Sequence, residues 1–189
     1  MAEDRRERVS EALRERLDSL WQDTSVKVVL LGPGSLASAG DFAKRRYLKD
    51  YLLSNLLSCD EVVLPEDVID DDISERFGLG PAEVELIRMS NVVLALIPPD
   101  GRVSGVFFEL RDLANIPTLV EKVRIFRPQD SISEWKSYKE DRVYSIYDIS
   151  RFVDYPAETW TTCAFIRPRA LQLVNNERRR LINLYFGIP

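Results

Sequence analysis

Residues 92–101 read Val-Val-Leu-Ala-Leu-Ile-Pro-Pro-Asp-Gly, and this stretch decides the fold. The apolar run at 92–97 is typical of a strand in a parallel sheet that is covered on both faces. The prolines, aspartate and glycine end the strand, and Ser104 is the expected N-cap of a helix that runs to residue 115. Ligands of open α/β sheets bind outside the carboxyl ends of the strands. Glu109, about one turn inside that helix, is therefore the first candidate for a functional residue.

Strands and helices alternate along most of the chain. Further strands are expected at 26–31, 61–64, 118–123 and 142–149, and helices at 3–21, 41–57, 80–90, 104–115 and 168–186. This order predicts an α/β fold with a three-layer, flavodoxin-like (Rossmann-like), mostly parallel sheet. We expect an amphipathic N-terminal helix within residues 1–22 and a single α/β domain over residues 23–189.

The bulk composition narrows the possible partners. The chain has 189 residues, of which 45% are hydrophobic, and this suits one globular domain. A net charge of −5 disfavours binding to nucleic acid, and the basic cluster at 178–180 is expected to be a solvated helix face. No apolar run reaches the roughly 20 residues of a membrane span, and the first residues lack the apolar core of a signal peptide. We therefore expect a cytoplasmic protein that binds neither membranes nor nucleic acid. The charged N-terminal helix and the aromatic residues of the C-terminal segment predict a homo-oligomer, such as a dimer.

The sequence contains no histidine and only two cysteines, Cys59 and Cys163. Catalysis by Ser-His or Cys-His pairs and zinc sites with histidine ligands are thereby excluded. The cysteines form no metal-binding motif, and the acidic stretch 70–72 is more typical of a solvated loop or a helix start than of a cation site. We expect no metal and no cofactor, so acid–base or nucleophilic chemistry falls to carboxylates, tyrosine, lysine or cysteine.

The first predicted strand is followed by a loop of small residues. Gly32, Pro33, Gly34 and Ser35 open the segment 32–40, which matches neither the dinucleotide-binding nor the P-loop glycine pattern. Glycine and serine still allow backbone amides to approach a sugar or phosphate closely, so these four residues are candidate ligand contacts.

The following predicted helix carries two adjacent arginines, Arg45 and Arg46. Neighbouring residues on a helix point in different directions, so we expect one of the two to be exposed and the other to face inward. The inward arginine, for which Arg45 is the candidate, is placed to meet a phosphate.

Three acidic residues are expected to converge at the strand ends. These are Glu83, Asp100 and Glu109, beside the hydroxyl of Ser104 and the exposed backbone of Gly105. Such a set suits the cleavage of an N-glycosidic bond, in which one carboxylate stabilises or traps an oxocarbenium-like sugar and another acts as acid or base. Each residue also has a structural alternative. Glu109 suits the surface of an amphipathic helix, Asp100 a turn, and Glu83 the first turn of a helix, where it would complement the helix dipole.

Several motifs resemble the nucleoside 2-deoxyribosyltransferase-like superfamily, including a bacterial branch with retron-associated defence effectors. The motifs are Leu-Leu-Gly-Pro-Gly at 30–34, Leu-Pro-Glu-Asp at 64–67, Glu-Val-Glu-Leu-Ile-Arg-Met-Ser-Asn-Val-Val-Leu-Ala-Leu-Ile at 83–97 and Ser-Gly-Val-Phe-Phe-Glu-Leu at 104–110. The resemblance covers about residues 26–123. It implies that Glu109 is the nucleophile, that Asp100 contacts the base or sugar, and that Glu83 lies near the sugar. Tyr47 and Tyr144 are candidates for the tyrosine that orients the nucleophile in such enzymes.

Two functions are compatible with these features. The first is an N-glycosidase or N-glycosyltransferase that acts on a nucleoside, nucleotide or NAD-like molecule, with a role in defence as a narrower version that rests on the resemblance. The second is a non-catalytic nucleotide-sensing module of similar fold, since a fold alone does not determine function.

Overall fold

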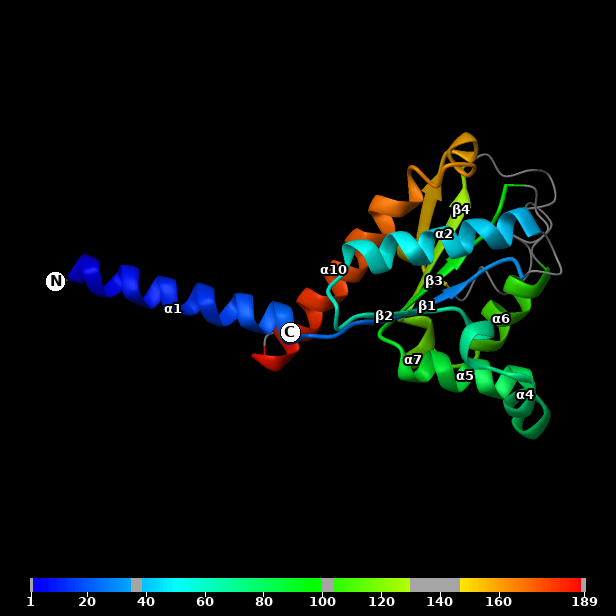
Figure 1. Cartoon of the computed structure of the whole chain (residues 1–189), viewed down its shortest axis with the longest axis horizontal. Coiled ribbons are helices and arrows are strands. Elements are labelled where there is room, and N and C mark those ends of the chain that lie inside the picture. Colours follow the sequence, from blue (N-terminus) through cyan, green and yellow to red (C-terminus); the bar gives the residue numbers. More distant parts are fainter. Residues whose placement is uncertain (1, 35–38, 100–103, 130–146, 188–189) are drawn as a thin grey trace.

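The computed structural model describes residues 2–34, 39–99, 104–129 and 147–187, and they build an α/β fold (Figure 1). A single parallel sheet has the strand order β2-β1-β3-β4-β5. Its strands are β1 (Lys27–Leu31), β2 (Glu61–Val63), β3 (Val92–Leu96), β4 (Val123–Pro128) and β5 (Phe152–Tyr155). This order is flavodoxin-like, so the predicted fold class is confirmed.

The apolar run at residues 92–97 contains β3, the middle strand of the sheet. Each residue of β3 is buried, which explains the unbroken apolar run. Val92 pairs with Val28 of β1, and Val93 pairs with Val123 of β4. The chain reverses its direction of strand addition between β1 and β3, so the topological switch point of the sheet lies between these two strands.

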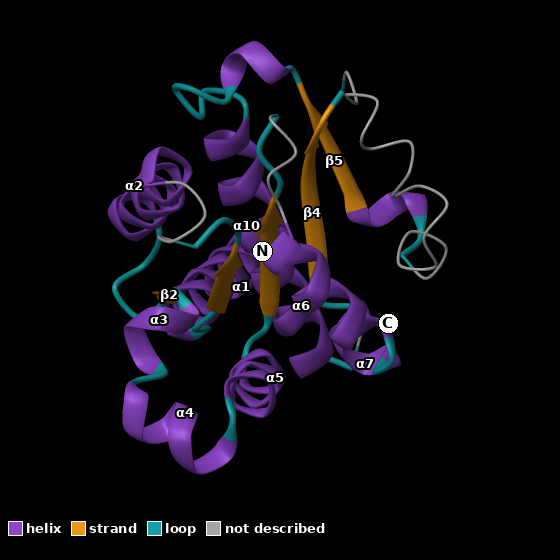
Figure 2. Cartoon of the chain, turned by 90° about the vertical axis from the view of Figure 1, so that its right-hand side faces the viewer, coloured by secondary structure: helices purple, strands orange, loops and turns teal. Residues whose placement is uncertain are grey.

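Helices cover both faces of the sheet (Figure 2). On one face, α2 (Ala39–Asn55) and α10 (Ile166–Tyr185) pack apolar side chains such as Leu48 and Val174 against the strands. On the other face lie α5 (Leu79–Met89), α6 (Ser104–Ala114) and α7 (Pro117–Val120), with Ile87 and Leu110 in the core. Two short helices, α3 (Pro65–Val68) and α4 (Asp71–Phe77), connect β2 to α5.

The N-terminal helix α1 (Ala2–Asp23) extends away from the α/β domain and touches it near α10 (Figure 1). Trp21, close to its end, lies over the guanidinium of Arg178 in α10, with 5.0 Å between the ring centroid and Cζ. Within the described part of the chain, no helix is long and apolar enough to cross a membrane.

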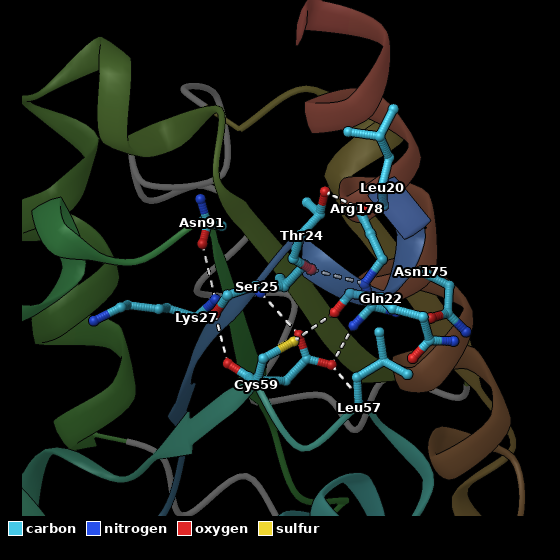
Figure 3. A network of polar contacts seen from close by, with 12 residues as sticks. Leu20, Gln22, Thr24, Ser25, Lys27, Leu57, Cys59, Asn91, Asn175 and Arg178 are labelled. Atoms are coloured by element: carbon cyan, nitrogen blue, oxygen red, sulfur yellow. Dashed lines mark hydrogen bonds and ion pairs between the residues drawn. The ribbon is translucent and has the colours of Figure 1, made fainter. Parts of the chain in front are cut away.

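A buried polar network joins the end of α1 to the domain (Figure 3). Arg178 forms an ion pair with Asp60 and donates a hydrogen bond to the carbonyl of Thr24 at 3.1 Å. The Asp60 carboxylate also accepts hydrogen bonds from the amides of Val26 and Leu57, at 2.8 and 2.9 Å. The prediction that residues 178–180 form a solvated face was therefore wrong for Arg178, which is buried because it has an acidic partner.

One predicted strand was misplaced, and another lies mostly on residues that the structure does not describe. Residues 117–120 form the short helix α7, because Pro117 stands at a first helical position that suits its fixed φ, and β4 begins only at Val123. The predicted strand at 142–149 lies partly outside the described residues. Asp148 then accepts a hydrogen bond from the amide of Ser150 at 2.8 Å, which starts a 3₁₀ turn, and the strand β5 follows it at Phe152.

Candidate functional site

The candidate site lies at the carboxyl ends of β1 and β3, where the strand order reverses. Gly32 follows β1 directly, and a Cβ built on it would lie 3.4 Å from the Cβ of Leu96, the last residue of β3. Helices α2 and α6, which follow these two strands on opposite faces, both start at the end of the sheet that lies away from α1 (Figure 1). Open α/β sheets bind their ligands at this position.

Arg45 of α2 is the inward arginine of the predicted pair, and Arg46 is exposed. The Arg45 side chain is 3% exposed and forms an ion pair with Glu66 of α3. Its Nη1 donates a hydrogen bond to the carbonyl oxygen of Gly32 at 3.1 Å. A Cβ at position 32 would stand 3.0 Å from Cδ of Arg45, so the glycine allows the guanidinium to lie across the end of β1.

Glu109 of α6 is a largely buried carboxylate of the site. Its Oε2 atom is buried and has no hydrogen-bond partner among the described residues. Burial raises the pKa of Glu109 to about 7, and the charge of Glu83 adds to this rise while the charge of Arg45 opposes it. A carboxyl group with such a pKa exchanges its proton near neutral pH, which is the range that acid–base chemistry requires.

Glu83 belongs to the same electrostatic group. Burial raises its pKa, and Arg45 acts against this shift. The interpretation of Glu83 as a first-turn residue that complements the helix dipole was wrong, because α5 already begins at Leu79 and has no acidic residue in its first turn. The structure therefore brings Glu83 and Glu109, from two different helices, into the electrostatic field of one arginine.

Arg45 carries the second unpaired polar atom of the site. Its Nε is buried without a hydrogen-bond partner in the described part of the chain, like Oε2 of Glu109. Burial lowers the pKa of Arg45, while Glu109, Asp67 and Glu83 act against that shift. A donor and an acceptor that are both buried and unpaired, on groups that interact electrostatically, are suited to contact a ligand.

Two acidic residues of α3 complete the surroundings of Arg45, although we assigned them no role from the sequence. Glu66 is the ion-pair partner of Arg45, and Asp67 forms an ion pair with Lys49 at 2.6 Å. Burial raises the pKa of Asp67, but the hydrogen bond and the charge of Lys49 outweigh this effect, so the pKa is lowered overall. The sequence feature that could have indicated this is Pro65, which starts a helix directly after β2. The helix places both acids at the same end of the sheet as the loop after β1.

The other predicted site residues are placed as follows. Gly32 and Pro33 are buried at the end of β1, and Gly34 is exposed. Ser104 and Gly105 form the first two residues of α6, whereas Ser35, Asp100 and Tyr144 lie outside the described residues.

Tyr47, the other predicted orienting tyrosine, points to a different part of the molecule. Its hydroxyl accepts a hydrogen bond from Nη1 of Arg167 in α10 at 2.7 Å, on the same face of the sheet as α2. Glu109 lies on α6, on the opposite face. Tyr47 is therefore engaged by α10, and nothing assigns it to the nucleophile.

No group of three or more acidic or cysteine side chains in the described residues is arranged to hold a metal ion. In the acidic stretch 70–72, Asp70 caps α4 by accepting a hydrogen bond from the amide of Ile73 at 2.9 Å, which agrees with the predicted helix start. No protein-family model matches the chain, and no curated protein matches it either.

Proposed function

We propose that the protein cleaves or transfers the N-glycosidic bond of a nucleoside, nucleotide or NAD-like molecule, with Glu109 as the nucleophile. The observation that carries this proposal is the buried Oε2 of Glu109 at the switch point of the sheet, which has no hydrogen-bond partner among the described residues and lies next to the charges of Arg45 and Glu83. A carboxylate that is free of hydrogen bonds is a better nucleophile than one that is solvated or paired.

In the proposed reaction, ionised Glu109 attacks the anomeric carbon of the sugar as the bond to the base breaks. The electron pair of that bond leaves with the base, which takes up a proton, and the sugar is held as an ester of Glu109. Water or a second base then displaces the carboxylate and regenerates it. The raised pKa of Glu83 suits it to supply the proton to the leaving base.

Arg45 has a positioning and electrostatic role in this scheme. Its charge opposes the rise in the pKa of Glu109 and so increases the fraction of ionised nucleophile at neutral pH. The ion pair with Glu66 and the hydrogen bond to Gly32 hold the guanidinium in place, while Nε, which has no partner within the described part of the chain, is assigned to contact the substrate.

The test is release of free base from a panel of nucleosides, nucleotides and NAD by wild type, Glu109→Gln and Glu85→Gln. Glu85 is an exposed glutamate of α5 that pairs with Arg88 at 3.0 Å, so it controls for loss of a carboxylate elsewhere. We expect turnover by wild type and by Glu85→Gln, and a loss of at least about a thousandfold in Glu109→Gln. Tight binding of a nucleotide without any turnover would instead support the sensing module.

A further inference from the structure

A cavity lies at the opposite end of the strands from Arg45 and Glu109. It has a volume of about 190 Å³ and lies between the amino-terminal ends of β3 and β4 and helix α10. Its charged and amide side chains are Glu121 and Lys122 just before β4, Arg124 in β4, Asn176, Glu177 and Arg180 from α10, and Asn91 before β3. A single water molecule needs only roughly 10–15 Å³, so the cavity has room for a small polyatomic ligand.

Two of the three cations that line the cavity, Lys122 and Arg124, are held by neutral oxygen atoms, whereas Arg180 pairs with a carboxylate. Nη1 of Arg124 donates hydrogen bonds to the carbonyls of Glu121 and Val123, at 2.9 and 2.8 Å. Arg151 donates to the same carbonyl oxygen of Glu121, so two guanidinium groups share one acceptor. Lys122 donates to the carbonyls of Arg88 and Ser90, at 2.8 and 2.7 Å. None of these carbonyl oxygens carries a charge that would balance the cations.

Positive charge is in excess around the cavity although the whole chain has a net charge of −5. The surrounding cations are Arg88, Lys122, Arg124, Arg151 and Arg180, against the carboxylates of Glu85, Glu121 and Glu177, of which Glu85 pairs with Arg88 at 3.0 Å. Glu177 is bound by Arg180 through two hydrogen bonds, of 2.9 and 2.6 Å. Burial lowers the pKa of Arg124, and the charges of Arg151 and Arg180 lower it further, while Glu177 acts against them. The positive charges of Arg124, Arg151 and Arg180 therefore repel one another where Arg124 is partly removed from water.

We infer that this cavity binds a small phosphoryl oxyanion between Arg124 and Arg180. The planar guanidinium group presents several donors in a geometry that suits the oxygens of a phosphate. Asn91 supports this assignment, because its Oδ1 accepts a hydrogen bond from the amide of Lys27 at 2.8 Å, which leaves its NH₂ group as a further donor. The inference is independent of the N-glycosidic activity, since the two sites lie at opposite ends of the strands.

The test is calorimetric titration of the full-length protein with inorganic phosphate at constant ionic strength, with ribose 5-phosphate in a second arm. We expect saturable binding by wild type and a loss of at least about tenfold in affinity in Arg124→Gln. The matched control is Arg127→Gln, because Arg127 lies on the same strand but pairs with Asp154 at its other end, at 2.5 Å. Its affinity for phosphate should equal that of wild type.

The two arms of the titration distinguish a site for free phosphate from a site for the phosphoryl group of a larger molecule. Binding of both ligands indicates a free phosphate site, and binding of ribose 5-phosphate alone indicates a site for the phosphoryl group of a larger molecule. Absence of saturable binding in both arms, or an equal loss in Arg124→Gln and Arg127→Gln, would overturn the inference. Arg180→Gln replaces an exposed side chain and repeats the measurement if Arg124→Gln does not fold, and it should also weaken binding.

Discussion

Asp60 and Arg178 are 118 residues apart in the sequence, yet their side chains form an ion pair that is 0% and 1% exposed. The pair connects the loop before β2 to α10, and through the carbonyl of Thr24 it reaches the segment that links α1 to β1. A charge that is buried to this degree is tolerated only while its partner is present.

Asp60→Ala should therefore destabilise the protein by about 3–5 kcal/mol, because it leaves Arg178 buried without a counter-charge. The control is the adjacent Glu61→Ala, which removes an exposed ion pair with Lys27 and should cost less than about 1 kcal/mol. Urea denaturation measures both free energies of unfolding. The double variant Asp60→Ala with Arg178→Met should be more stable than Asp60→Ala alone, and additive losses would contradict this account.

Gly32→Ala should disturb the candidate site, whereas Gly34→Ala should not. A Cβ at position 32 would stand 3.0 Å from Cδ of Arg45 and 3.4 Å from Cβ of Leu96, so the arginine must shift. We expect a loss of stability of about 1–3 kcal/mol for Gly32→Ala. A Cβ at position 34 meets nothing within 4 Å, so Gly34→Ala should change stability by less than about 0.5 kcal/mol. Thermal unfolding of the two variants makes the comparison, and equal effects would refute it.

The raised pKa of Glu109 predicts a dependence of stability on pH. Its usual pKa of 4.5 applies to the unfolded chain, and burial raises the pKa to about 7 in the folded protein. Between these values the folded state holds a proton that the unfolded state has released, so stability falls as the pH rises from about 4.5 to 7. Glu109→Gln should remove up to about 3 kcal/mol of this loss above pH 7 and change little near pH 4. Denaturation of wild type and Glu109→Gln at both pH values measures the difference, with Glu85→Gln as the control.

Neighbouring substitutions should shift the pKa of Glu109 in opposite directions. Arg45 lowers that pKa and Glu83 raises it, so Arg45→Gln should move it upward and Glu83→Gln downward. Titration of the Glu109 carboxyl carbon by NMR measures both shifts without any substrate. A shift of the same sign in the two variants would show that conformational change, not charge, determines the pKa.

If Glu109 is the nucleophile, the same group should govern the reaction rate. The value of kcat/KM should rise roughly tenfold per pH unit below about pH 7 and level off above it, because only the ionised carboxylate attacks the sugar. Arg45→Gln should move the midpoint of this profile to higher pH. A profile that falls through this range would instead assign Glu109 the role of a proton donor.

Sequence patterns were sufficient for the parts of the molecule that depend on local structure. The apolar run of β3 predicted a buried central strand, and neighbouring positions on a helix predicted that only one of Arg45 and Arg46 faces inward. Strand 118–123 was misplaced because its apolar residues fit a helical turn and a strand equally well, and Pro117 favoured the turn. Local patterns therefore identify elements well and their boundaries poorly.

Ion pairs between residues that are distant in the sequence could not be predicted from local patterns. Nothing in residues 178–180 distinguishes Arg178 from its two neighbours, and its burial depends on Asp60 in a distant loop. The same holds for Glu66, whose contact with Arg45 arises only when α3 folds back over the end of β1. At the site, the sequence supplied the chemical types, while the unpaired atoms and the pKa of Glu109 became evident from the packing.

The helices that carry Arg45 and Glu109 lie in different layers, one on each face of the sheet. The distance between these two charges therefore depends on how both layers rest on the strands between them. The ionisation of Glu109 is consequently sensitive to the packing of both helical layers at this end of the sheet. A remote cavity-forming substitution in either core should be detectable as a change in the titration of one carboxyl group.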